Sequence, residues 1–90
     1  MKKKRERLEI IYDILHTIMV NRNKCKPTKI LYKSNLSHQM MSQYLDFLIE
    51  KEFIIETPTE QSKEYSLQEK GFEYLEKYKI IKEFTSSFDL

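Results

Sequence analysis

Hydrophobic positions along the chain predict three helices, a β-hairpin and a final helix. Apolar residues recur at three- and four-residue steps over about residues 5–22, which is the pattern of an amphipathic helix. Pro27 marks a boundary, because the residue before a proline avoids helical geometry, and a short helix is expected after it at about 28–33. Ser37 is a residue type that often caps helix N-termini, so a third helix is expected from there to about residue 51.

The second half of the sequence changes from helical to alternating periodicity and back. β-branched and aromatic residues at 53–57, a polar turn at 58–62 and alternation at 63–67 predict two short strands that form a hairpin. Helical spacing returns from residue 68 to about 84, with apolar residues on two sides of the helix. One side has to pack against its own domain, so the other has to be buried elsewhere.

The order of these elements is that of a winged helix-turn-helix, in which a short helix, a tight turn and a second helix are followed at once by a hairpin. The expected fold class is mainly α with a small β-hairpin (α+β), in one domain over 1–90. We assign 8–67 to the winged-helix core, 68–84 to an extra C-terminal helix and 85–90 to a tail. Most aromatic residues are expected at packing positions: Tyr12, Tyr44, Phe47, Phe53, Tyr65 and Phe72.

Charge is divided unevenly between the two parts of the chain. Up to Lys33 there are ten basic and three acidic residues, a net charge of +7. From Ser34 onward there are six basic and eleven acidic residues, a net charge of −5. A basic first third is what a surface for binding a polyanion looks like, although two solvated faces would give the same counts.

Composition argues against several kinds of site. The single glycine leaves little room for a glycine-rich phosphate loop, and no apolar run approaches the roughly 20 residues that span a bilayer. Two histidines and one cysteine, widely separated, do not have the spacing of metal ligands. His16 lies three residues after Asp13, which indicates a surface pair more than a catalytic one. We therefore expect no enzyme activity, no cofactor or metal, and no small-molecule substrate.

Cys25 is the one cysteine, so an internal disulfide is excluded and a reducing cytoplasm is the expected location. It lies between Lys24 and Lys26, whose charges could lower the pKa of its thiol. A plain free thiol at the surface is the favoured interpretation.

Three stretches resemble a known family: KPTKILYKSNLS at 26–37, YLDFLIEK at 44–51 and YSLQEKG at 65–71. They resemble archaeal winged-helix transcription regulators, and among these the small dimeric archaeal DNA-binding proteins whose C-terminal helices pair as an antiparallel coiled coil. The resemblance covers about 10–82 and implies a winged-helix fold, double-stranded DNA binding and a homodimer. It makes the second apolar side of the C-terminal helix the expected dimer surface, formed by Tyr74, Tyr78, Ile81 and Phe88.

The sequence departs from that family at three places. Glu52 stands where these sequences usually have a glycine that ends the recognition helix, so this helix end is expected to be weaker or differently shaped. Gln68 replaces the usual threonine cap of the last helix. The last helix is also short for a long coiled coil, which affects the pairing geometry more than the fold.

The helix expected at 37–51 is the one that would lie in the major groove, with the hairpin at 53–67 as the wing. Gln39 and Gln43 share a face one turn apart, and a glutamine amide can bond the N6 and N7 edge of adenine. Uncharged side chains would then read the bases, although the same face could simply be solvated. The predicted base-facing residues are His38, Gln39, Ser42 and Gln43.

Basic residues around this helix supply the charge that its exposed face lacks. Phosphate contacts set affinity and position, whereas base contacts set sequence preference. Asp46 faces the same way as the glutamines and would repel phosphate, so it is expected where the helix has left the groove. The predicted phosphate contacts are Lys26, Lys29, Lys33, Ser37 and Lys63.

Two functions remain open from the sequence. The first is a double-stranded DNA-binding protein, either a transcription regulator or a small chromatin-type protein. The second is a winged-helix protein-protein interaction module without DNA binding, which the net charge of −5 beyond Ser34 and the aromatic tail at 84–88 favour. The two differ in salt dependence, because only a DNA binder that uses several lysines loses affinity steeply as salt rises.

Overall fold

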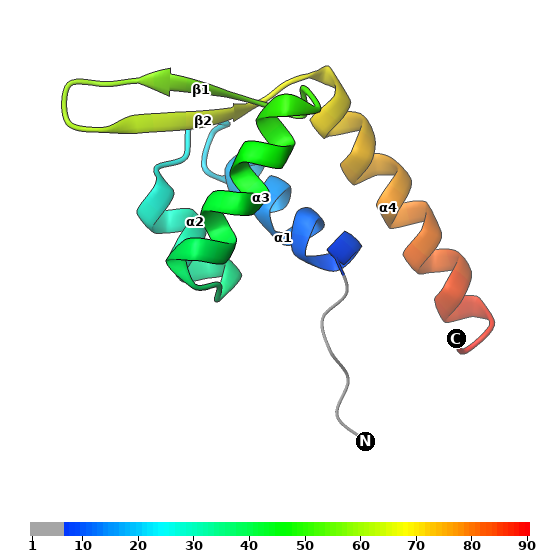
Figure 1. Ribbon diagram of the computed structural model, residues 1–90. Coiled ribbons are helices and arrows are strands. Elements are labelled where there is room, and N and C mark those ends of the chain that lie inside the picture. The colour runs from blue at the N-terminus through cyan, green and yellow to red at the C-terminus, as the bar shows by residue number, and fades with distance from the viewer. Residues whose placement is uncertain (1–6) are drawn as a thin grey trace.

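The computed structural model describes residues 7–90, so the start of the predicted first helix and the basic run at 2–5 lie outside the described part. The elements follow the predicted order, and the fold class of mainly α with one antiparallel hairpin is confirmed (Figure 1). The last helix runs to Ser87, three residues farther than predicted. The elements are α1 (Arg7–Val20), α2 (Pro27–Ser34), α3 (His38–Glu50), β1 (Ile54–Pro58), β2 (Lys63–Leu67) and α4 (Glu69–Ser87).

The core forms where α1 meets the other elements. Ile14, Leu15 and Ile18 of α1 are fully buried, and they share one core cluster with equally buried residues of α2, α3 and β1. Burying one such side chain stabilises the fold by about 1.5–3 kcal/mol, so this cluster is the main source of stability. The other fully buried residues of this cluster include Ile30, Leu48 and Ile54.

The turn between α2 and α3 is fixed by backbone geometry at both ends. Asn35 ends α2 in the left-handed conformation, with φ of 56°, and its N–H donates to the Leu31 carbonyl oxygen at 3.1 Å. Ser37 caps α3, because its Oγ accepts a hydrogen bond from the Met40 N–H at 3.1 Å. The predicted start of the third helix is therefore confirmed by a specific cap.

The hairpin gains a third partner that the sequence pattern did not reveal. β1 and β2 pair antiparallel, and the outer edge of β2 also pairs with Cys25, through two backbone hydrogen bonds to Tyr65 of 3.0 and 2.8 Å. This pairing buries Cys25 to 1% exposure, so the expectation of a surface thiol was wrong. Burial raises the pKa of the Cys25 thiol and outweighs the smaller lowering effect of Lys29, so the alternative of a thiol pKa lowered by neighbouring lysines is wrong as well.

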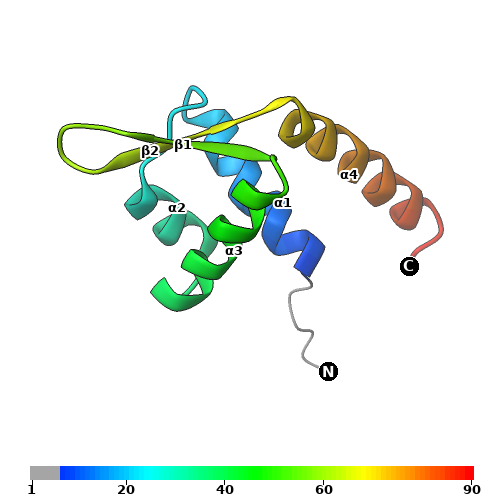
Figure 2. The same ribbon diagram turned by 45° about the horizontal axis from the view of Figure 1, so that its top comes forward.

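A row of aromatic side chains attaches the first half of α4 to α1. Tyr78 stacks on Tyr12 with ring centroids 4.7 Å apart, and Tyr74 packs edge-on against Phe53 at 5.8 Å. The Tyr74 hydroxyl donates to the Leu8 carbonyl oxygen at 2.7 Å, and burial raises the pKa of Tyr74 to about 12. The second half of α4 extends away from the domain (Figures 1 and 2).

The first turn of α4 lies too close to Phe53, the residue before β1, for any side chain at Gly71. A Cβ there would lie 2.6 Å from the carbonyl oxygen of Phe53, a distance that forces the backbone apart. The same oxygen accepts a hydrogen bond from the Gln68 N–H at 2.9 Å. α4 therefore starts from a fixed point at the base of the hairpin.

Substitution of Glu52 by glycine should stabilise the protein. Glu52 follows the C-cap of α3 with φ of 65°, a left-handed conformation in which the Cβ of a non-glycine residue is strained. After the extra flexibility of glycine is subtracted, we expect Glu52→Gly to raise the free energy of unfolding by about 0.5–1 kcal/mol. Urea denaturation measures this change. Glu52→Ala is the matched control, because it also removes the carboxylate but keeps the Cβ, and equal stability of the two variants would contradict the strain.

Candidate functional site

The exposed face of α3 carries the four predicted base-facing residues. Met41, Leu45 and Leu48 are buried, which turns the opposite side of the helix to solvent. The structure thus exposes the whole predicted set of His38, Gln39, Ser42 and Gln43.

Acidic residues follow the glutamines toward the end of α3. At helical spacing, Asp46 and Glu50 continue the stripe begun by Gln39 and Gln43, and both are exposed. The exposed face of α3 is therefore neutral in its first half and negative in its second half. On this exposed face, only the first half suits contact with a polyanion.

The loop before α2 and the first turns of α2 form a basic surface. Lys24, Lys26 and Lys29 line a hollow of about 470 Å³, and the ring of Tyr32 beside them is 81% exposed. Lys33 is also exposed, one turn after Lys29. The three predicted phosphate contacts on this side therefore lie on α2 or at its N-cap, next to α3: Lys29 and Lys33 are in the helix and Lys26 precedes it.

The remaining two predicted phosphate contacts have more restricted surroundings. The Ser37 hydroxyl is used as the cap of α3. Lys63 is half-buried at the start of β2, opposite Pro58, in a hairpin that also carries Glu56, Glu60 and Glu64. The hairpin is therefore acidic, so its tip lacks the positive charge expected of a wing that follows phosphates.

Beside α3, on the side away from α2, is a cationic cluster that the sequence pattern did not reveal. The Arg7 guanidinium lies over the ring of Phe47, with Cζ 4.4 Å from the ring centroid, and Lys51 Nζ lies 5.9 Å from the same centroid. Arg7 and Phe47 are forty positions apart, so no local spacing relates them. The signal that could have found this cluster was a partly exposed aromatic residue on a helix flank, next to a basic residue at i+4.

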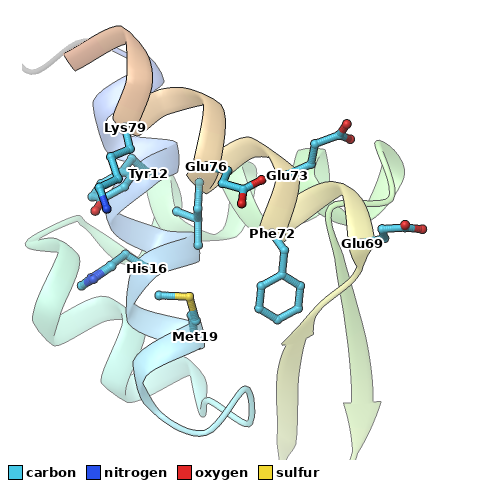
Figure 3. Close-up of a pocket in the computed structure, with 9 residues that line it drawn as sticks. Tyr12, His16, Met19, Glu69, Phe72, Glu73, Glu76 and Lys79 are labelled. Atoms are coloured by element: carbon cyan, nitrogen blue, oxygen red, sulfur yellow. The ribbon is translucent and has the colours of Figure 1, made fainter. Parts of the chain in front are cut away.

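A groove between α1 and α4 has an apolar floor and an acidic rim (Figure 3). It encloses about 690 Å³, and Phe72 points into it with 43% of its surface exposed, so the expected packing of Phe72 in the core was wrong. Within residues 7–90, no three His, Cys, Asp or Glu side chains gather closely enough to hold a metal ion. The groove is lined by Tyr12, His16, Met19, Glu69, Phe72, Glu73, Leu75, Glu76 and Lys79.

The predicted dimer surface divides into two parts. Tyr74 and Tyr78 are half-buried against α1 of their own chain, whereas Ile81 and Phe88 are exposed. Ile80 and Phe84, which were not part of the predicted dimer surface, are exposed on the same end of α4. In the part of the chain that the structure describes, no helix is long and apolar enough to cross a membrane.

Comparison with known proteins gives a match to one family and to several solved structures. The profile of the winged helix-turn-helix family matches residues 4–86. Sso10a-2, a DNA-binding protein from Sulfolobus solfataricus, is 26% identical and superposes with a TM-score of 0.78 over 94% of this chain and 90% of that one. F93 from STIV, a winged-helix DNA-binding protein, has a TM-score of 0.70 at 23% identity over 91% and 92% of the two chains, which shows a common fold.

Curated relatives come from the archaeon Methanocaldococcus jannaschii. The uncharacterised protein MJ0290 is 36% identical over 78 residues, which cover 87% of this chain and 34% of that protein. The uncharacterised protein MJ0287 is 39% identical over 51 residues, which cover 57% of this chain and 50% of that protein. The matched part thus spans between about a third and a half of the length of these relatives.

Proposed function

This chain belongs to the winged helix-turn-helix family, and from that premise we propose that it binds double-stranded DNA with α3 in the major groove. The observation that carries the proposal is the exposed amide pair Gln39 and Gln43, next to the lysines of α2. The similarity in fold and sequence to Sso10a-2, a DNA-binding protein, over 94% of the chain supports it.

The proposal assigns different tasks to the two kinds of side chain. Lys26, Lys29 and Lys33 neutralise phosphates and set the position of α3, while Gln39 and Gln43 bond base edges. His38 and Ser42 lie beside the glutamines, where they can reach base edges or phosphate. The carboxylates of Asp46 and Glu50 then lie where the exposed face of α3 leaves the groove, and Lys63 is the one cationic contact of the wing.

Titration of the protein onto a random-sequence duplex at several salt concentrations tests the DNA binding. If the lysines neutralise phosphates, the logarithm of the affinity should fall linearly with the logarithm of the salt concentration, with a slope of about −0.9 per phosphate. Fluorescence anisotropy of a labelled duplex measures this slope. Weak binding that does not respond to salt would contradict the proposal and favour a protein-interaction module.

Separate substitutions of the lysines and of the glutamines should have different effects. Lys29→Ala and Lys33→Ala should each weaken binding to all duplexes alike and make the salt slope shallower by about one. Gln39→Ala and Gln43→Ala should leave the slope unchanged and reduce discrimination between sequences, at about 1–3 kcal/mol for each lost bidentate contact. Binding to a library of duplexes, followed by sequencing, measures the preference.

The same library distinguishes a transcription regulator from a chromatin-type protein. A sequence preference that depends on Gln39 and Gln43 assigns a transcription regulator with defined sites. Uniform binding to all sequences, with no effect of the glutamine substitutions, assigns a chromatin-type role and shows that the base-reading assignment is wrong.

We also propose that the protein is a homodimer joined through the second half of α4. Ile80, Ile81, Phe84 and Phe88 are exposed there, on a segment that extends away from the rest of the domain (Figure 2). An apolar cluster on such a segment is typical of a protein interface. Because Tyr74 and Tyr78 pack against their own α1, they act mainly by holding α4 in place. Two-fold symmetry would present two copies of α3 to a roughly palindromic site.

Introduction of a charge at Ile81 should separate the two copies without unfolding them. Ile81→Glu places a carboxylate in the exposed apolar surface, so we expect monomers by sedimentation and an unchanged far-ultraviolet circular dichroism spectrum. Lys79→Glu is the control, because it introduces the same carboxylate two residues away, beside the groove and outside that surface. Tyr78→Glu should instead lower the thermal stability, since Tyr78 stacks on Tyr12. A wild-type protein that is monomeric at micromolar concentration would contradict the assignment.

A further inference from the structure

Two cations share one aromatic ring on the flank of α3. Arg7, the first described residue of α1, places its guanidinium carbon 4.4 Å from the centroid of Phe47. Lys51, the C-cap residue of α3, places its ammonium nitrogen 5.9 Å from the same centroid. Both distances are within the range of about 6 Å in which the negative face of an aromatic ring attracts a cation.

The ring holds the cations in place without neutralising them. Within residues 7–90, no carboxylate lies within ion-pair distance of Arg7 or Lys51. A guanidinium stacked on a ring has lost part of its rotational freedom already, yet its N–H groups still point outward as donors. An anion that binds there therefore meets a positioned positive charge, and less entropy is lost on binding.

The position of this cluster relates it to the base-facing residues. Arg7 and Phe47 line a shallow hollow of about 280 Å³ together with Gln43, Met40 and Tyr44. In both ribbon views α2 lies on one side of α3 and the start of α1 lies on the other (Figures 1 and 2). The lysines of α2 and the pair on Phe47 therefore border α3 on opposite flanks.

We propose that Arg7 and Lys51 on the ring of Phe47 form a second phosphate-binding site, which grips the DNA backbone on the side of α3 opposite to α2. This inference rests on the proposed DNA binding. A helix in the major groove, which is about 12 Å wide, lies between two phosphate backbones, so cations on one flank alone would leave the other backbone uncontacted. The pair also offsets the repulsion of phosphate by Asp46 and Glu50 on the exposed face of α3.

The competing explanation is that Arg7 only covers the ring of Phe47 with its aliphatic stem, as long basic side chains often do. In that case removal of its charge would leave DNA affinity unchanged. The two explanations therefore differ in a measurable quantity, the salt dependence of binding.

The test compares four variants for binding to one labelled duplex by fluorescence anisotropy. Arg7→Gln should weaken binding roughly threefold to tenfold and make the salt slope shallower by about 0.9. Arg7→Lys, which keeps the charge, should retain the wild-type slope. Phe47→Leu keeps an apolar side chain but removes the aromatic face, so it should weaken binding by a smaller factor. Lys70→Gln is the matched control, since Lys70 lies 5.3 Å from the centroid of Phe53 and belongs to α4, which is not assigned to the DNA-binding surface, so this substitution should have no effect.

The combined variant tests whether the ring positions the charge. If it does, Arg7→Gln should weaken binding less in the Phe47→Leu background than in the wild type, because the charge is no longer held.

Thermal melting by circular dichroism confirms that each variant is folded. If the Arg7→Gln variant binds as tightly as the Lys70→Gln variant, the second phosphate site is wrong. DNA binding itself would still be supported by the salt slopes of the wild type and of Lys29→Ala. Independent effects of Arg7→Gln and Phe47→Leu would overturn the role of the ring. A wild-type protein without salt-dependent binding would overturn the proposed function itself.

Discussion

Burial of α1 is the constraint on which the arrangement of the whole chain depends. Ile14, Leu15 and Ile18 are removed completely from water, and α2, β2 and α4 all pack against this one helix. A chain of ninety residues has room for only one such core, so the elements that carry function are positioned by the same contacts that stabilise the fold. The flank of α3 depends on α1 as well, because Arg7 reaches Phe47 from the first turn of α1.

Charge in this molecule is separated by element, and the net value of +2 hides the separation. The positive charges beside α3 come from α2, from the start of α1 and from the end of α3, whereas the hairpin and the second half of α3 are negative. A uniform positive surface would attract any polyanion in many orientations. Positive flanks with a neutral centre and negative ends favour one orientation, because the acidic parts are repelled wherever the basic parts would be misplaced.

The sequence predicted the elements of the fold because periodicity is a local signal, and Ser37 marked the start of α3 for the same reason. It failed where the outcome depends on contacts between distant residues. A one-residue strand such as Cys25 has no periodicity, so its pairing with Tyr65 was missed and its thiol was placed at the surface. Two apolar sides on the last helix could not show which side its own domain would cover, so Phe72 was assigned to the core, and Ile80 and Phe84 were left out of the predicted dimer surface. The contact between Arg7 and Phe47 depends on how α1 crosses α3, which residue spacing does not encode.

The close approach of Gly71 to Phe53 has a mechanical consequence. The first turn of α4 is hydrogen-bonded to the base of the hairpin and packs closely against it, and Tyr74 and Tyr78 contact α1, so we expect α4 to keep a fixed direction relative to the domain. If two copies pair symmetrically through the outer ends of α4, a shift of the helix–helix contact by one helical turn would displace one copy of α3 relative to the other by about 5 Å. The distance between the two half-sites on DNA would then be set by the register in which the two α4 helices pair. A different half-site spacing would require a different pairing register rather than a longer linker.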